Sequence, residues 1–176
     1  MVCTANVCRS PMGAGLLLRN LRAAGHDAVV TSAGTRSFGV PVDPVATQSM
    51  RDLGVDISGH VPRQFDTTIL DIDGADLIVA MTREHLRALV ASHRTTFGRT
   101  FTLRELLRRC GQYGRTNVGW DEWLSSVAFG RTASALMGND EADDISDPYG
   151  LGRGRVNSTA SELDLLTQQL AAAAPW

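Results

Sequence analysis

Residues 75–93 read ADLIVAMTREHLRALVASH and contain the pattern that decides the fold. Residues 75–81 are almost continuously apolar, which is typical of a strand that is buried on both faces of a sheet. Residues 82–93 change to helical spacing, with Thr82 as the expected N-cap and Glu84 in the first turn. A buried strand that passes directly into a helix indicates an α/β fold with a parallel sheet.

The same alternation of strands and helices continues on both sides of this unit. Two further β-rich runs, 27–35 and 99–103, are predicted strands. Helical spacing and end signals predict helices at 12–25, 43–54, 102–110, 120–128 and 156–174. Within 43–54, Asp43 is the expected N-cap and Gly54 the expected end. We therefore expect one α/β domain over residues 1–176, with a four-stranded parallel sheet and helices on both faces.

Composition excludes several classes of protein. A hydrophobic share of 43% and a charged share of 20% are ordinary for a globular domain, and no run approaches the length of a membrane span. The net charge of −2 gives no reason to expect nucleic acid or an anionic membrane as a partner. Three cysteines are an odd number, which argues against a disulfide scaffold and for a reducing compartment, so we predict a cytoplasmic location.

Reactive side chains are crowded into the first ten residues, MVCTANVCRS. Cys3 and Arg9 are separated by five residues, and Ser10 and Pro11 follow where the first helix is expected to begin. Backbone N–H groups at a helix N-terminus favour an anion and are expected to lower a thiol pKa, to about 3.5–7.5 in known cases. Arg9 can hold two oxygens of the same anion, and Ser10 can donate a hydrogen bond to the thiolate. These properties indicate a thiolate nucleophile that attacks a phosphate ester and requires no metal.

The spacing of Cys3 and Arg9 is weak evidence when taken alone. Such a pattern occurs by chance, and a buried cysteine is often only a small apolar side chain. A zinc site is a poorer interpretation, because Cys3 and Cys8 are wrongly spaced and only Cys110 remains.

Further segments extend the evidence over the rest of the chain. They are CTANVCRSP (3–11), SAGT (32–35), GHVPRQF (59–65), ADLIVAM (75–81) and DPYG (147–150). Their order and approximate spacing resemble those of the low-molecular-weight protein tyrosine phosphatases, over most of the chain but weakly from about 111 to 141. The resemblance implies a phosphatase without cofactor or metal that acts on a phosphotyrosine-containing protein or another aryl phosphate through a cysteinyl-phosphate intermediate.

The resemblance also implies roles for individual residues. Cys3 is the nucleophile, Arg9 binds the phosphoryl oxygens, and Asp147 is the general acid that protonates the leaving group. The other implied positions are the phosphate-binding residues Thr4, Ala5, Asn6, Val7, Cys8 and Ser10, the supporting residues Ser32 and His60, and the substrate walls Phe38 and Tyr149. A purely structural histidine at His60 and simple packing at Phe38 and Tyr149 stay open, and Asp143 and Asp144 are expected to be solvated.

The chain departs from the family pattern at several positions. Ala5 stands where the family usually has glycine, and alanine is tolerated there if the φ of this residue is negative. Thr82 stands where many members carry aspartate. Two other functions stay open. An arsenate reductase of the same fold needs two further cysteines, whereas only Cys110 lies beyond the first loop. A phosphate- or phosphopeptide-binding module is expected to lose Cys3 or Asp147, and both are present.

The first strand of the expected sheet is short. Only Met1 and Val2 precede Cys3, whereas the family has a strand of several apolar residues there. Two residues cannot span a sheet at about 3.3 Å each. We therefore expect the native chain to begin several residues earlier, with a run rich in Val, Ile and Leu, which the genomic frame or mass spectrometry of the native protein would test. The sequence leaves the oligomeric state open.

Overall fold

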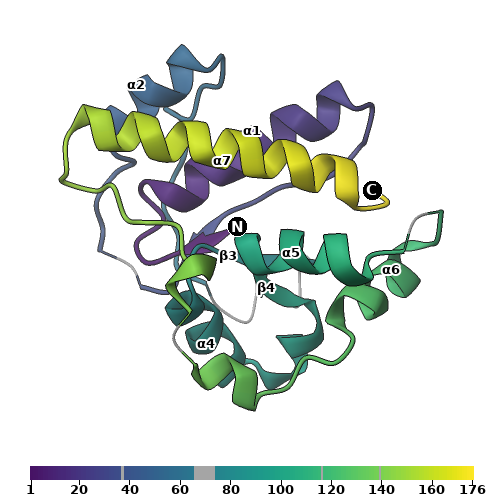
Figure 1. Ribbon diagram of the computed structural model, residues 1–176. Helices are drawn as coiled ribbons and strands as arrows, with labels where there is room; N and C mark the ends of the chain where they lie inside the picture. Colours follow the sequence, from purple (N-terminus) through teal and green to yellow (C-terminus); the bar gives the residue numbers. More distant parts are fainter. Residues whose placement is uncertain (37, 66–73, 116, 139) are drawn as a thin grey trace.

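A computed structural model describes residues 1–36, 38–65, 74–115, 117–138 and 140–176 (Figure 1). Strands and helices alternate along the chain as predicted. They are β1 (Val2–Cys3), α1 (Arg9–Ala23), β2 (Ala33–Gly34), α2 (Pro44–Asp52), β3 (Ile78–Ala80), α4 (Arg83–Ser92), β4 (Thr100–Thr102), α5 (Leu103–Tyr113), α6 (Trp120–Ala128) and α7 (Arg153–Ala173). Short 3₁₀ turns η1 (Arg94–Arg99), η2 (Ser134–Met137) and η3 (Glu141–Asp143) lie between them.

The four strands form one parallel sheet in the order β2-β1-β3-β4. Val2 in β1 pairs with Ala33 on one side and Ala80 on the other, so the shortest predicted strand occupies the centre. This topology confirms the expected four-stranded parallel sheet. It also places Cys3 at the carboxyl edge of the sheet, where parallel α/β folds bind their ligands.

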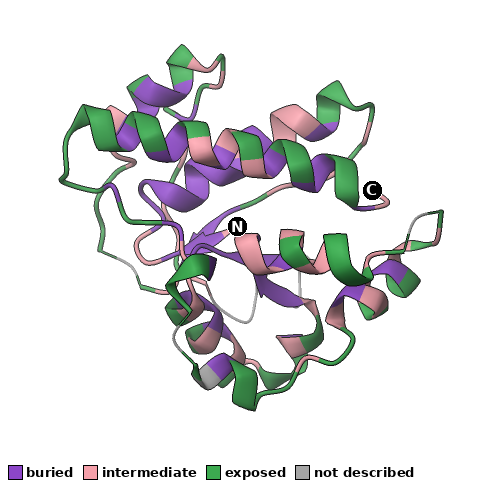
Figure 2. Cartoon of the chain, viewed as in Figure 1, coloured by how far each residue is buried: buried purple, intermediate pink, exposed green. Residues whose placement is uncertain are grey.

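Helices cover both faces of the sheet, as predicted. Alternate strand residues point to opposite faces: Cys3, Val79 and Phe101 join the core cluster that includes α1 and α7 residues, whereas Val2 and Ile78 join the cluster that includes α4 residues. In Figure 1, α7 lies along α1 on one side, and α4 lies on the other. Figure 2 shows the buried residues gathered where these layers meet. Among the described residues, no helix has both the length and the apolar composition that crossing a membrane requires.

Most helices begin where the sequence predicts. The side chains of Asp43, Thr82 and Thr102 accept hydrogen bonds from backbone N–H groups three residues later, at 2.7, 3.2 and 3.1 Å, and so cap α2, α4 and α5. Helix α1 begins at Arg9, three residues before the predicted start. Pro11 is tolerated there because N–H groups in a first turn have no partner within the helix.

Strands β2 and β3 are shorter than the β-rich runs that predicted them. The residues ahead of β2 and β3, 27–32 and 74–77, flank a cavity of about 590 Å³ instead of a strand. Met1 lies at this cavity, and its amino group donates a hydrogen bond to the Thr31 carbonyl at 2.9 Å. A strand requires a ladder of hydrogen bonds to a neighbouring strand, and among the described residues the ladder pairs of β2 and β3 begin only at Ala33 and Ile78. The apolar run expected ahead of Met1 stays a prediction.

Candidate active site

The loop from Cys3 to Arg9, here the Cys3–Arg9 loop, joins the carboxyl end of β1 to the first turn of α1. The Cys3 Sγ atom is buried and lies 2.9 Å from Ser10 Oγ and 3.3 Å from the backbone nitrogen of Asn6. Asn6 Nδ2 donates to Ser10 Oγ at 2.9 Å, so the Ser10 hydroxyl proton can point at the sulfur, which is nearer than its other acceptor, the Ala33 carbonyl at 3.4 Å. A thiolate at Cys3 therefore has two hydrogen-bond donors.

Asn6 holds the loop in its tight conformation. Its φ of 59° lies in the left-handed region, which asparagine tolerates better than most residues. Asn6 Nδ2 also donates to Ser32 Oγ at 2.8 Å, while Oδ1 accepts from the Arg63 backbone N–H at 3.0 Å and lies 3.1 Å from His60 Nε2. His60 Nε2 also contacts the Asn6 carbonyl at 3.0 Å. Ser32 and His60 thus both contact the loop directly.

His60 reaches Asn6 as a neutral donor. Burial, with a smaller contribution from the charge of Arg63, lowers the pKa of His60 below its ordinary value. Both Asn6 atoms in contact with Nε2 are oxygens, so Nε2 carries the ring proton. His60 therefore supports the loop through Asn6, and whether it has more than this structural role stays a prediction.

Gly34 of the SAGT segment allows the loop to lie close against β2. A Cβ atom at Gly34 would lie 2.5 Å from the Thr4 carbonyl oxygen, which is shorter than the van der Waals contact distance. The same approach lets Thr35 N–H donate to the Cys3 carbonyl at 2.8 Å and Arg36 N–H to the Thr4 carbonyl at 2.9 Å. Ala5 is absent from the residues with positive φ, so its Cβ is accommodated in place of the usual glycine.

Arg9 and Asp147 meet beside this loop although 138 positions separate them. The Arg9 guanidinium is buried; Nη2 lies 2.5 Å from Asp147 Oδ2, and Nη1 donates to the Ile145 carbonyl at 3.1 Å. The other carboxylate oxygen of Asp147 accepts from the Tyr149 backbone N–H at 3.2 Å. The structure therefore brings a thiol, a guanidinium and a carboxylate to one edge of the sheet.

The family model described as low molecular weight phosphotyrosine protein phosphatase matches residues 1–115. The chain belongs to this family. EpsP of Ralstonia solanacearum, named a probable low molecular weight protein-tyrosine-phosphatase, is 36% identical over 107 residues, which cover 60% of this chain and 70% of EpsP. The phosphatase Ptp of Acinetobacter johnsonii is 31% identical over 144 residues, or 81% of this chain and 92% of Ptp. The crystal structure of a low molecular weight protein tyrosine phosphatase from T. tengcongensis matches with a TM-score of 0.72 at 29% identity, covering 97% of this chain and 95% of that chain.

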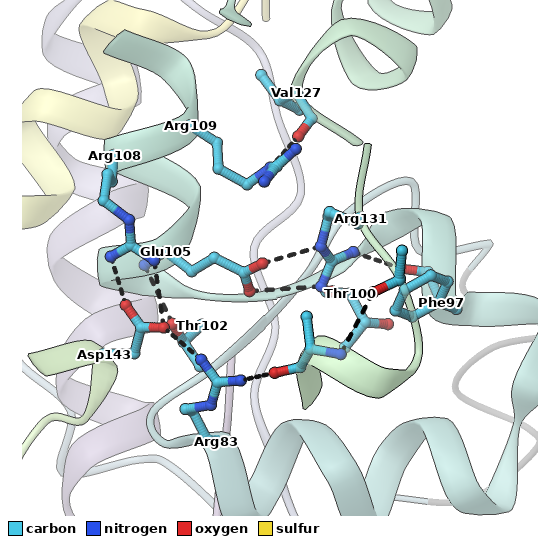
Figure 3. A network of polar contacts seen from close by, with 12 residues as sticks. Arg83, Phe97, Thr100, Thr102, Glu105, Arg108, Arg109, Val127, Arg131 and Asp143 are labelled. Atoms are coloured by element: carbon cyan, nitrogen blue, oxygen red, sulfur yellow. Dashed lines mark hydrogen bonds and ion pairs between the residues drawn. The ribbon is translucent and has the colours of Figure 1, made fainter. Parts of the chain in front are cut away.

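In this low-molecular-weight phosphatase, a buried ion-pair cluster anchors the segment that leads to Asp147 (Figure 3). Asp143 is fully buried; Oδ1 lies 2.6 Å from Arg108 Nη1, and Oδ2 lies 3.0 Å from Arg83 Nη1. Asp144 Oδ1 accepts from the Arg83 backbone N–H at 2.7 Å. The expectation that Asp143 and Asp144 are solvated is therefore wrong for Asp143, because two guanidinium groups compensate its burial. Asp144 is partly buried.

The predicted substrate walls lie at the surface. Phe38 and Tyr149 are each 56% exposed. Tyr149 lies two residues after Asp147, and Phe38 lies two residues after Arg36, whose backbone N–H contacts the Cys3–Arg9 loop. Their positions leave both rings accessible to a ligand, and their role as walls stays a prediction.

The other two cysteines differ from Cys3 in environment. Cys8 is buried at the N-cap of α1, and burial together with the nearby charges of Asp43 and Asp147 raises its pKa to about 12. Cys110 lies within α5, where burial raises its pKa to about 11. Both are therefore poor thiolates at neutral pH.

Sequence reasoning missed His85, a buried residue of the first turn of α4. Its Nε2 atom lies 2.8 Å from Thr4 Oγ1, and its Nδ1 atom lies 2.8 Å from Thr82 Oγ1. Thr82, noted as a departure from the family, thus contacts the Cys3–Arg9 loop through His85. The signal was present: a histidine three positions after an N-cap, in a helix that starts at the carboxyl edge of the sheet next to β1.

Proposed function

We propose that this protein is a metal-independent phosphatase that hydrolyses phosphate monoesters of the phosphotyrosine type through a cysteinyl-phosphate intermediate. The observation that carries the proposal is the meeting of Cys3, Arg9 and Asp147 at the N-terminus of α1. No two of these groups suffice, because the reaction needs a nucleophile, a ligand for the transferred phosphoryl group and a proton donor for the leaving oxygen.

The first step forms a bond from sulfur to phosphorus and breaks the ester bond. The Cys3 thiolate attacks while backbone N–H groups of the Cys3–Arg9 loop and the Arg9 guanidinium hold the phosphoryl oxygens. Asp147, as the carboxylic acid, transfers its proton to the departing phenolate oxygen. In the second step the Asp147 carboxylate accepts a proton from water as the water oxygen attacks phosphorus. The sulfur leaves as a thiolate, which Ser10 and the Asn6 N–H stabilise at the distances given above.

The substrate class rests on the family and on the exposed rings. The relatives named above carry the name protein-tyrosine-phosphatase, and Phe38 and Tyr149 are exposed aromatic rings that suit an aromatic leaving group. We further propose that the phosphatase domain spans residues 1–176. Asp147 lies beyond the part that the family model matches, and α7 packs along α1, the helix that supports the loop.

Two other functions fit less well. A reductase that passes a disulfide between cysteines needs further mobile thiols, whereas Cys110 lies within α5 with a raised pKa. A module that only binds phosphate needs no acid, whereas Asp147 lies directly against Arg9.

The test is turnover of p-nitrophenyl phosphate with excess chelator, followed by peptides that carry phosphotyrosine or phosphoserine and by phosphoarginine, which has a P–N bond. We expect hydrolysis of the aryl ester and preference for phosphotyrosine. Cys3→Ser should abolish turnover and retain vanadate binding, Arg9→Ala should lose both, and Cys110→Ser, the matched control, should match the wild-type protein. Full turnover by Cys3→Ser would refute the mechanism, and thiol-dependent reduction of arsenate without ester hydrolysis would favour the reductase.

A further inference from the structure

The His85 ring joins the Cys3–Arg9 loop to the start of α4. Each ring nitrogen contacts one hydroxyl, Nε2 that of Thr4 and Nδ1 that of Thr82, both at 2.8 Å. His85 is 5% exposed, so little solvent competes for these contacts. Arg9 Nη2 lies 3.5 Å from the same Thr4 hydroxyl oxygen. Thr4 Oγ1 is therefore located between a buried imidazole and the guanidinium that is proposed to bind phosphate.

The pattern of donors fixes where the ring proton lies. Burial and the charge of Arg9 lower the pKa of His85 to about 4, so the ring is neutral at neutral pH and carries one N–H. Thr82 Oγ1 already accepts the His85 backbone N–H at 3.2 Å. Nδ1 lies 2.8 Å from the Thr82 hydroxyl oxygen, which can donate its own proton to a ring nitrogen that carries none. With one lone pair of Thr82 Oγ1 already used, the contacts favour donation of the Thr82 proton to Nδ1, which leaves the ring proton on Nε2, where it donates to Thr4.

This arrangement leaves the Thr4 hydroxyl with one direction for its own proton. Thr4 Oγ1 accepts from His85 Nε2 and is approached by Arg9 Nη2, which together occupy its two lone pairs. Its proton must then go to a third group. A phosphoryl oxygen held by Arg9 is the acceptor that the proposed reaction supplies at this place.

We propose that His85 orients the Thr4 hydroxyl as a donor to the phosphoryl group of the substrate. Thr4 then contacts substrate through its side chain as well as its backbone, and His85 is a positioning residue that acts through Thr4. With the opposite tautomer, Thr4 would donate to His85 and turn a lone pair toward the anion, which weakens binding. The inference rests on the proposed function for its ligand, a phosphoryl group.

The tautomer can be observed directly by NMR on protein labelled with ¹⁵N in its histidine rings, with inorganic phosphate bound. Two-bond proton–nitrogen correlations distinguish the two neutral tautomers, and the loss of one set of signals in His85→Gln assigns that set to His85. We expect the proton on Nε2. A proton on Nδ1, or a doubly protonated ring, overturns the inference.

Variants test the consequence for binding, with inorganic phosphate as the probe. Since a hydrogen bond to a charged group is lost, Thr4→Val should bind phosphate roughly 10- to 100-fold more weakly, whereas Thr4→Ser keeps the hydroxyl and should stay close to wild type. His85→Leu should also weaken binding, and His85→Gln, whose amide can accept from Thr82 and donate to Thr4, should restore it. Unaltered phosphate binding by Thr4→Val overturns the inference.

A double-variant cycle separates orientation from simple structural support. If His85 acts through Thr4, adding His85→Leu to Thr4→Val should change phosphate binding little further. A full additional loss in the double variant would give His85 a separate structural role and overturn the inference. Failure of the wild-type protein to hydrolyse p-nitrophenyl phosphate would instead refute the proposed function, while the tautomer and the phosphate affinities would remain readable.

Discussion

Arg9 and Asp147 form an ion pair in which a buried guanidinium nitrogen lies 2.5 Å from a carboxylate oxygen whose side chain is 50% exposed. The residue that is proposed to bind phosphate thus holds the proposed acid when no anion is bound. An arriving phosphoryl group competes with Asp147 for Nη2, and the carboxylate is released next to the leaving oxygen. Removing the carboxylate therefore affects both anion binding and proton transfer.

Asp147→Asn should slow the hydrolysis of phenyl phosphate by about 10²–10⁴-fold, the usual contribution of a general acid. A highly activated aryl phosphate, whose leaving group needs no proton, should lose much less. The same variant should bind inorganic phosphate at least as tightly as wild type, because its amide competes less for Arg9. Steady-state kinetics with a series of aryl phosphates measures this difference, and an equal loss on good and poor leaving groups would place the acid elsewhere.

Peroxide should join Cys3 and Cys8 in a disulfide that thiols reverse. The two cysteines are the first and sixth residues of one tight loop, and both are buried. Oxidation of Cys3 to a sulfenic acid allows the Cys8 thiol to displace water and form the S–S bond, which protects Cys3 from irreversible oxidation. Because the pKa of Cys8 is raised to about 12, we expect this step to be slow. Recovery of activity after peroxide and dithiothreitol measures it.

Cys8→Ser tests the protective role, with Cys110→Ser as its matched control. The first variant should be inactivated irreversibly, and the second should recover as the wild-type protein does. Equal recovery of all three proteins would exclude a protective disulfide.

Asp143→Asn should lower the free energy of unfolding by roughly 3 kcal/mol, because it leaves two guanidinium groups against a buried site without their counter-charge. Its control is Glu122→Gln, which removes an exposed ion pair with Arg115 and should cost less than about 1 kcal/mol. Urea unfolding followed by circular dichroism compares the two. At temperatures where it stays folded, Asp143→Asn should also lose activity on poor leaving groups, because the anchored segment leads to Asp147. Equal stability of the two variants would contradict the anchoring role.

Stability should decrease as the pH falls from about 6.5 toward 4 because of His85. Its pKa is lowered from 6.5 to about 4 in the folded protein, so the unfolded chain binds a proton in this range while the folded protein does not. The contribution of the neutral, buried His85 ring to the free energy of unfolding is fully present above pH 6.5. Its loss by pH 4 amounts to roughly 3 kcal/mol. Urea midpoints measured across this range should show a shallower slope in His85→Gln than in wild type. Parallel slopes would show that His85 is not the group responsible.

Local patterns predicted the sheet, the helices and the Cys3–Arg9 loop because each depends on residues close in sequence. The N-caps Asp43, Thr82 and Thr102 lie where their helices begin. Strand lengths were overestimated, since β propensity cannot show whether a hydrogen-bonded neighbour is present. The runs 27–35 and 75–81 are paired only over Ala33–Gly34 and Ile78–Ala80.

The rest of the site depends on contacts between distant positions, which no local pattern reveals. Asp147 was found only through the family resemblance, because an Asp-Pro pair alone indicates a turn. His85 is 81 positions from Thr4. Asp143 was expected to be solvated because the neighbouring sequence does not reveal its partners. Arg83 and Arg108 lie 60 and 35 positions before it.

Two of the three tryptophans of the chain, Trp120 and Trp176, line the cavity on the amino-terminal side of the sheet, and the buried Trp123 packs against Trp120. The Trp120 ring centroid lies 5.1 Å from that of Trp123 and 5.3 Å from that of Trp176, close enough for the rings to exchange excitation energy. The intrinsic fluorescence of the protein therefore comes from one coupled cluster at the edge opposite Cys3. We therefore expect the emission to change when the cavity is filled or when Trp176, which follows α7, leaves Trp120, and to change little when an anion enters the Cys3–Arg9 loop.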